Sequence, residues 1–86
     1  MIDTPTLRKL AAMGQASHLI AKGVPGGYIL VLRSGLDEEA LKAQRGGPRL
    51  FRKLEAVVNY LADMGISSFE VDSSSWDPDS LLNRRG

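Results

Sequence analysis

Five basic side chains lie within twelve consecutive residues, 42–53, and no acidic residue stands between them. They are Lys42, Arg45, Arg49, Arg52 and Lys53. Such a cluster can neutralise several phosphates of a nucleic acid, which produces salt-dependent binding. A predicted helix follows the cluster, and its first N–H groups can also hold an anion. The segment therefore predicts contact with nucleic acid or another anion. The alternative is that its arginines pair across the domain with acids, namely Glu38, Glu39, Glu55 or Glu70.

Residue types needed for other chemistry are scarce. The chain has no cysteine and a single histidine, His18, so it cannot assemble a zinc site from several nitrogen or sulfur ligands. The acids Asp72, Asp77 and Asp79 lack the spacing of a calcium-binding loop. No motif pairs a serine with His18 as its base. The glycine pairs at 26–27 and 46–47 match no phosphate-loop pattern. We therefore expect no catalytic residue, no metal site and no cofactor, and so no enzyme.

Charge is distributed unevenly along the chain. Residues 1–53 hold nine Lys or Arg against four Asp or Glu, a net charge of +5, and residues 54–86 hold two against six, a net charge of −4. A domain with two such poles can present a basic surface to a polyanion and an acidic surface to a basic partner. The simpler alternative is that both surfaces are only solvated.

Length and composition indicate one small globular domain. The chain has 86 residues, of which 43% are hydrophobic, enough for a single core. No apolar run approaches the roughly 20 residues of a membrane span, and the first ten residues lack the order of a signal peptide. The lack of cysteine is compatible with a reducing compartment. We expect a soluble, cytoplasmic protein that makes no membrane contact.

Turn residues divide the first half of the chain into elements. Thr4-Pro5 predicts the start of a short helix capped by Thr4, with Gly14 as its end. Residues 16–22 predict a strand, or else a continuation of that helix. After the turn at 23–27, residues 28–33 predict the clearest strand, because they are rich in β-branched and aromatic side chains. Residues 38–45 are strong helix formers, but their place between two turns favours a third strand.

The second half contains one amphipathic helix and one strand. Leu54, Val57, Val58 and Leu61 follow helical spacing, with Phe51 one turn earlier and Gly65 at the end. Residues 69–72 alternate apolar and acidic side chains, as in a half-buried strand. These patterns predict a core, whose members are Leu30, Leu32, Phe51, Leu54, Val57, Val58, Leu61, Phe69 and Val71.

Together these elements predict an α+β fold of order α-β-β-β-α-β. A short N-terminal helix precedes a three-stranded antiparallel meander, an amphipathic helix that packs on one sheet face, and a final strand. Residues 1–72 form this single domain, and residues 73–86 form a polar, flexible tail. The strand at 28–33 is apolar on both sides, so its second face needs the N-terminal helix, a second subunit or a partner.

Two aromatic residues are predicted partner contacts. Tyr28 begins the doubly apolar strand, which leads us to expect self-association as a homodimer. Trp76 stands alone in the polar tail, where an aromatic side chain can anchor to a partner pocket. Alternatively, Trp76 folds back over an exposed edge or face of its own domain.

The stretch from Gly26 to Asp72 resembles a known family. The residues that carry the resemblance are Ala43-Gln44-Arg45-Gly46-Gly47, Arg49-Leu50-Phe51-Arg52-Lys53-Leu54, Tyr60-Leu61, Gly65-Ile66 and Phe69-Glu70-Val71-Asp72. They are similar to plasmid-borne partition-associated proteins of the ParC family, which are unrelated to the topoisomerase subunit of the same name. The resemblance implies a role beside plasmid or mobile-element maintenance and no defined activity.

These observations favour a non-enzymatic accessory protein of plasmid partition. We expect it to bind a protein partner or the DNA of a mobile element, through the sheet face or the basic turn. The alternative is a small inhibitor or antitoxin-like protein of such an element that blocks a protein partner.

Overall fold

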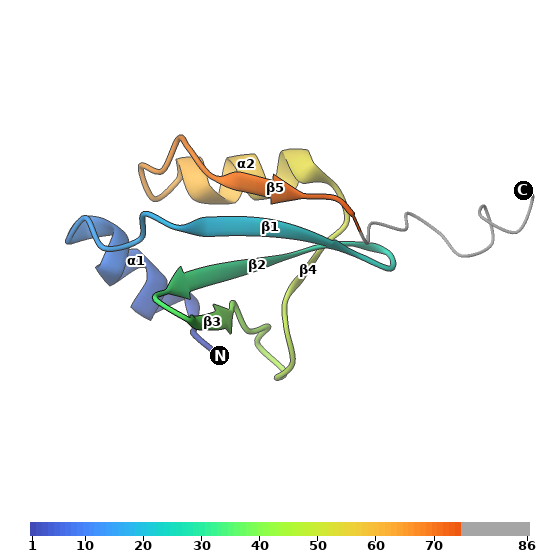
Figure 1. Ribbon diagram of the computed structural model, residues 1–86, viewed down its shortest axis with the longest axis horizontal. Helices are drawn as coiled ribbons and strands as arrows, with labels where there is room; N and C mark the ends of the chain where they lie inside the picture. Colours follow the sequence, from blue (N-terminus) through green and yellow to red (C-terminus); the bar gives the residue numbers. More distant parts are fainter. Residues whose placement is uncertain (75–86) are drawn as a thin grey trace, which may run out of the picture.

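A computed structural model describes residues 1–74 as a mixed β-sheet with two helices against one of its faces (Figure 1). The elements in order are α1 (Thr4–Ala12), β1 (Leu19–Val24), β2 (Gly27–Ser34), β3 (Asp37–Ala40), β4 (Leu50–Phe51), α2 (Leu54–Ala62) and β5 (Glu70–Asp72). The predicted α-β-β-β-α-β order is confirmed, with the two-residue strand β4 as an addition. Within the described residues, no helix is long and apolar enough to cross a membrane.

The sheet has the strand order β3-β2-β1-β5, and β4 pairs with β2 as well. Strands β1, β2 and β3 form the predicted antiparallel meander, in which Ile20 lies opposite Val31 and Arg33 lies opposite Glu38. Strand β5 runs parallel to β1. Strand β4 places Phe51 opposite Tyr28.

The turn between β1 and β2 requires glycine. Gly26 has a φ of 90°, a left-handed conformation that glycine adopts without steric cost. At Gly27, a Cβ atom would collide with the backbone carbonyl of Phe51. The absence of a side chain at Gly27 therefore allows β4 to pass close to this hairpin.

The segment after the second hairpin shows tertiary context overriding helix propensity. Residues 37–40 form β3 although Glu and Ala favour helices. The strand is shorter than the predicted 38–45, because the chain turns over residues 43–47. Leu41, directly after β3, is only 2% exposed. Burial of this leucine and pairing with β2 stabilise the extended conformation.

The N-cap of helix α1 lies one residue earlier than predicted. Asp3, not Thr4, is the N-cap, and its carboxylate accepts a hydrogen bond of 2.9 Å from the Thr6 N–H. Aspartate is as good a cap as threonine or better, so Thr4 lies in the first turn. Gly14, with a φ of 71°, follows the end of the helix as expected.

Helix α2 begins at Leu54, so the prediction that Phe51 lies one helical turn earlier is wrong; Phe51 belongs to β4. Val57 and Leu61 are fully buried, but Val58 is 45% exposed and Val71 is 47% exposed. Their assignment to the core is therefore also wrong. Val58 lies on an exposed side of α2, and Val71 lies on the edge strand β5, so neither side chain is enclosed.

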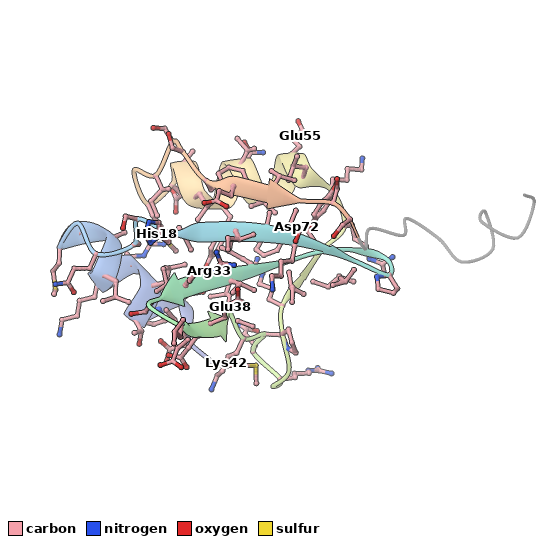
Figure 2. All side chains as sticks on the ribbon, in the orientation of Figure 1. His18, Arg33, Glu38, Lys42, Glu55 and Asp72 are labelled. Atoms are coloured by element: carbon pink, nitrogen blue, oxygen red, sulfur yellow. The ribbon has the colours of Figure 1, made fainter. Side chains whose placement is uncertain are left out.

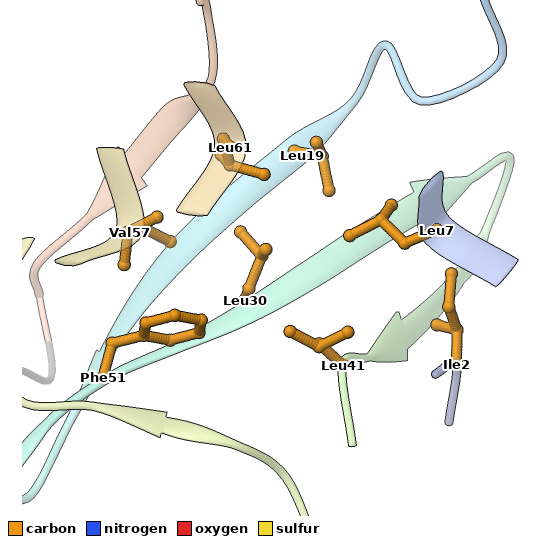
Figure 3. Close-up of a cluster of buried hydrophobic side chains, with 9 residues drawn as sticks. Ile2, Leu7, Leu19, Leu30, Leu41, Phe51, Val57 and Leu61 are labelled. Atoms are coloured by element: carbon orange, nitrogen blue, oxygen red, sulfur yellow. The ribbon is translucent and has the colours of Figure 1, made fainter. Parts of the chain in front are cut away.

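The core lies between the sheet and the two helices (Figure 3). Leu7 of α1 and Val57 and Leu61 of α2 belong to one buried cluster. The other members are Ile2, Leu19, Ala21, Leu30, Leu41 and Phe51. Leu32, Leu54 and Phe69 pack against this cluster and are partly buried. Both helices thus cover the same face, and α1 does not cover the second one.

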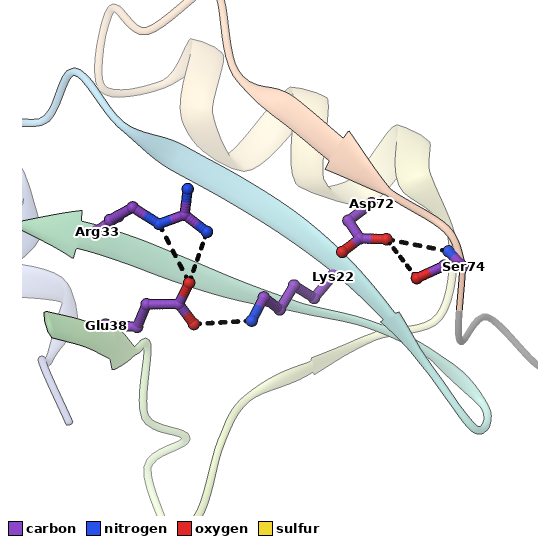
Figure 4. Close-up of polar contacts among 5 residues, drawn as sticks. All are labelled: Lys22, Arg33, Glu38, Asp72 and Ser74. Carbon is purple, nitrogen blue, oxygen red and sulfur yellow. Dashed lines mark hydrogen bonds and ion pairs between the residues drawn. The ribbon is translucent and has the colours of Figure 1, made fainter. Parts of the chain in front are cut away.

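The second face of the sheet, which neither helix covers, carries the side chains that alternate with the core residues. Its centre is apolar yet inaccessible, since Ile20 is 3% and Val31 is 4% exposed. Beside them, Glu38 accepts hydrogen bonds of 2.7 Å from Lys22 Nζ and from Arg33 Nη2 (Figure 4). These two partners lower the pKa of the Glu38 carboxyl. The carboxylate thus stays charged and ties β1, β2 and β3 together across this face.

Candidate functional site

Residues 42–53, called the basic segment here, run from the end of β3 to the start of α2 (Figure 1). Lys42 forms an isolated bridge with Pro48, which closes the turn at residues 43–47. Beyond Pro48 the segment enters β4. The structure therefore brings Lys42 close to Arg49, and places Arg52 and Lys53 further along, directly before α2.

Backbone hydrogen bonds fix the conformation of the turn. The Ala43 N–H donates to the Gly47 carbonyl at 2.8 Å, and the Gly46 N–H donates to the Ala43 carbonyl at 3.1 Å. Gly46 and Gly47 both have positive φ, of 88° and 68°. Two consecutive left-handed residues make a tight turn that glycine permits. Arg45 is exposed in this turn.

No cation of the basic segment forms an ion pair within residues 1–74. The ion pairs of this part of the chain join the Met1 amino group to Glu39, Arg8 to Asp63, and Lys22 and Arg33 to Glu38. The alternative that the segment's arginines pair with Glu38, Glu39, Glu55 or Glu70 is therefore wrong. Figure 2 also shows Lys42 and Glu55 at opposite sides of the molecule.

Arg49 contacts aromatic rings instead of an acid. Its Cζ lies 4.9 Å from the centroid of the Phe51 ring and 4.8 Å from that of the Tyr60 ring. The two rings meet edge to face, with centroids 5.4 Å apart. A guanidinium at this distance is attracted to the aromatic faces. Phe51 and Tyr60 thus hold Arg49 in place.

Arg52 and Lys53 lie at the other end of the basic segment. Lys53 is the N-cap of α2, and its side chain makes no capping hydrogen bond. Both residues are exposed. The partial positive charge at the start of α2 adds to the field of these two side chains.

A cleft opens where the basic segment meets the start of α1. Its lining residues are Asp3, Thr4, Pro5, Lys42, Ala43, Gln44 and Arg49, and its volume is about 760 Å³. The Thr4 hydroxyl shares a hydrogen bond of 2.7 Å with the Tyr60 hydroxyl, which joins the start of α1 to α2. Hydrogen bonds from Thr6 lower the pKa of the Asp3 carboxyl. The cleft therefore contains two cations and one ionised carboxylate.

Sequence reasoning identified Lys42 and Arg49 but missed the other polar residues of this cleft. The sequence predicts only a capping role for Thr4 and no functional role for Asp3 and Gln44, nor for Tyr60, which does not line the cleft but shares a hydrogen bond with Thr4. Tyr60 directly precedes the buried Leu61 on α2 and is itself half-buried. Its contact with Thr4 depends on the packing of α1, for which the sequence gives no local signal.

The remaining predicted residues lie elsewhere. Tyr28 is half-buried on the helix-covered face and packs against the core, opposite Phe51. Trp76 and most of the predicted tail lie outside the described residues. His18 is exposed. Within residues 1–74, no three His, Cys, Asp or Glu residues are placed to hold a metal ion. Contact of Tyr28 and Trp76 with a partner and the homodimer stay predictions.

Comparison with known proteins identifies the family. The ParC-like family model matches residues 2–80. The chain belongs to the ParC-like family. The match begins at residue 2, so it includes α1 and β1 as well as the stretch from Gly26 to Asp72 that carries the resemblance. No curated protein and no solved structure matches this ParC-like chain.

Proposed function

We propose that this ParC-like protein is a non-enzymatic accessory factor of plasmid or mobile-element maintenance and partition. It acts in the cytoplasm by binding another macromolecule through the basic segment. Membership of the ParC-like family supports the link to plasmids. The fold supports a binding role, because a rigid sheet and two helices hold an exposed, irregular segment at the side of the domain.

One observation carries the proposal: within residues 1–74, the cations that lie outside 42–53 are mostly paired, whereas those of the basic segment are not. Arg8, Lys22 and Arg33 each contact a carboxylate. The five cations of the basic segment contact none, so they are available to a polyanion without the cost of breaking an existing ion pair. DNA is the polyanion most closely connected with plasmid maintenance, and phosphate contacts supply most non-specific affinity for it.

The irregular shape of the segment favours contact with the phosphate backbone over reading of bases. Base recognition in the major groove requires a helix or a two-stranded ribbon that enters the groove. Residues 43–49 form a tight turn and a short extended run instead. We therefore expect binding that depends on charge and salt, with little preference for sequence.

The proposal is tested by capture from an extract of a plasmid-bearing host on the immobilised full chain. A matched column carries a variant in which Lys42, Arg45 and Arg52 are changed to Gln. Recovery of plasmid DNA or a ParA-type ATPase on the wild-type column, and its loss on the variant column, would support the proposal. Equal recovery on both columns would refute a role for the basic segment. A toxin or nuclease on the wild-type column would support the inhibitor alternative instead.

A further inference from the structure

We propose that the cleft between the start of α1 and residues 42–49 is a phosphate-binding site, with Lys42 and Arg49 as its charged donors. The cleft volume of about 760 Å³ lies within the range of about 300–1,000 Å³ that is typical of small-ligand sites. This inference rests on the proposed function and deepens it, because it names the chemical group that the basic segment binds at a defined place.

The guanidinium of Arg49 is positioned before any ligand arrives. The rings of Phe51 and Tyr60 lie 4.9 and 4.8 Å from its Cζ, and its backbone N–H donates to the Leu41 carbonyl at 2.8 Å. Contact with ring faces leaves the in-plane N–H groups of a guanidinium available for hydrogen bonds. Within residues 1–74 no carboxylate forms an ion pair with the Arg49 guanidinium. Such a fixed fork of donors fits two oxygens of one phosphate.

Lys42 supplies the second positive charge from the opposite strand of the turn. Its backbone is held on both sides, by the bridge to Pro48 and by a hydrogen bond of 2.9 Å from its N–H to the Ile2 carbonyl. Its ammonium forms no ion pair within residues 1–74, although its charge helps to lower the pKa of the Asp3 carboxyl. The amide of Gln44 and the hydroxyl of Thr4, which also line the cleft, are further polar groups within it.

The negative charge of Asp3 opposes the binding of phosphate in the cleft and so weakens the affinity. Its carboxylate lines the cleft and accepts the Thr6 N–H at 2.9 Å, and this hydrogen bonding lowers the pKa of Asp3. The group is therefore ionised at neutral pH and repels an anion. Because Asp3 already caps α1, the donors to phosphate are the side chains of Lys42 and Arg49 and not the helix end. Replacement by Asn keeps a good cap and removes the charge.

The test is a titration of the isotope-labelled full chain with sodium pyrophosphate, followed by nuclear magnetic resonance. We expect shifts of the Arg49 side-chain N–H and of the amides of residues 3–4 and 42–44. Lys42→Gln and Arg49→Gln should each weaken binding by about tenfold or more, as expected for loss of a charge-assisted hydrogen bond. Asp3→Asn should tighten it. The matched control is Lys9→Gln, which removes an exposed cation of α1 outside the cleft and should have little effect.

Three results would overturn the inference: no shifts at these residues, an equal loss in Lys9→Gln, or no gain in Asp3→Asn. The spectrum of each free variant shows whether it is folded, and if Arg49→Gln unfolds, Lys42→Gln and Asp3→Asn decide the question. Parallel titrations with ADP and with a short DNA duplex distinguish a free nucleotide from a nucleic-acid strand as the source of the phosphate. Binding of pyrophosphate or ADP without duplex retention would support the cleft and refute the proposed DNA contact. Retention of the duplex without any shifts by pyrophosphate or ADP would refute the cleft and leave the proposed DNA contact standing.

Discussion

Thr4 and Tyr60 share a hydrogen bond of 2.7 Å between their hydroxyl groups, although they lie 56 positions apart in the sequence. Thr4 begins α1 and lines the cleft, while Tyr60 lies in α2 and its ring contacts Arg49. This bond therefore connects the two helices at the point where the basic segment passes them. The position of α1 and the position of Arg49 depend on the same tyrosine.

Tyr60→Phe should lower the free energy of unfolding by about 1 kcal/mol, the usual net contribution of one hydrogen bond. The phenylalanine ring keeps the contacts with Phe51 and Arg49, so only the bond to Thr4 is lost. Urea unfolding followed by circular dichroism measures the change. Thr4→Val and the double variant complete a mutant cycle. If the two single effects simply add in the double variant, the hydroxyl groups do not stabilise one another.

Two adjacent valines of α2 should respond in opposite ways to a charge. Val57→Asp should unfold the domain, because a buried unpaired charge costs several kcal/mol against a total stability of about 5–15 kcal/mol. Val58→Asp should be tolerated, since Val58 is 45% exposed. Thermal unfolding of both variants tests this contrast. Cooperative melting of Val57→Asp near the wild-type temperature would refute the assignment of the buried helix face.

The comparison of Val57 with Val58 also shows what sequence patterns can predict. Helical spacing identified α2 and its apolar side, a run of β-branched and aromatic residues identified β2, and alternation identified β5. The same spacing could not show that α2 buries only a narrow strip, because that depends on the position of the helix relative to the sheet edge. Phe51 was assigned to the helix for a similar reason. Its pairing with Tyr28 in β4 is a contact between distant residues, and local periodicity carries no information about it.

For the candidate site, too, the sequence predicted local features but not the contacts between distant residues. The composition of the basic segment was evident from the sequence, as was the turn within it. Whether its arginines were already paired depended on where the acids lie in the fold, and the sequence left this open. Glu38 lies opposite Arg33 in the sheet and also reaches Lys22, so it is not available to Arg45 or Arg49. The cleft required the docking of α1 beside residues 42–49, which no local pattern predicts.

Glu38 should make the stability of the domain depend on acidic pH. Hydrogen bonds from Lys22 and Arg33 lower its pKa in the folded protein. A lowered folded pKa means that the contribution is fully present above the unfolded value, about 4.3 for Glu, and is lost as pH falls below it. Glu38→Gln should therefore be less stable than the wild type at neutral pH, with the difference shrinking below about pH 4. Melting temperatures from neutral pH to pH 3 measure this.

The dependence of the melting temperature on pH also includes contributions from two other acids, Asp3 and Asp72. Hydrogen bonds from Thr6 lower the pKa of Asp3, and hydrogen bonds from Ser74 lower that of Asp72. Like Glu38, both groups lose their contribution to stability as the pH falls. Melting of the wild type alone therefore cannot show which carboxyl causes the loss. Asp3→Asn and Asp72→Asn serve as controls that retain Glu38. A difference between wild type and Glu38→Gln that stays constant down to pH 3 would contradict the proposed role of the carboxylate.

Binding of duplex DNA should be electrostatic and should depend on the basic segment. Each phosphate neutralised contributes a slope of about −0.9 in log affinity against log salt concentration. Replacing Arg49 and Arg52 by Ala should therefore lower the affinity and make the slope less steep by about 1.8, if each contacts one phosphate. Because phosphate contacts carry no sequence information, the loss should be the same for unrelated duplexes. Fluorescence anisotropy over a range of salt concentrations measures both quantities.

The matched control for this double variant is Arg8→Ala with Lys9→Ala, which removes the same charge from α1. Arg8 already pairs with Asp63 at 3.4 Å, and neither residue belongs to the basic segment. If affinity depended only on net charge, both double variants would lose it equally, and the assignment to residues 42–53 would be wrong. If the wild type were not retained on duplex DNA even at about 50 mM salt, where counterion release favours binding strongly, the basic segment would be a protein-binding or merely solvated surface and would not contact DNA. A loss confined to one DNA sequence would mean that the arginines read bases, contrary to the backbone contact proposed from the shape of the segment.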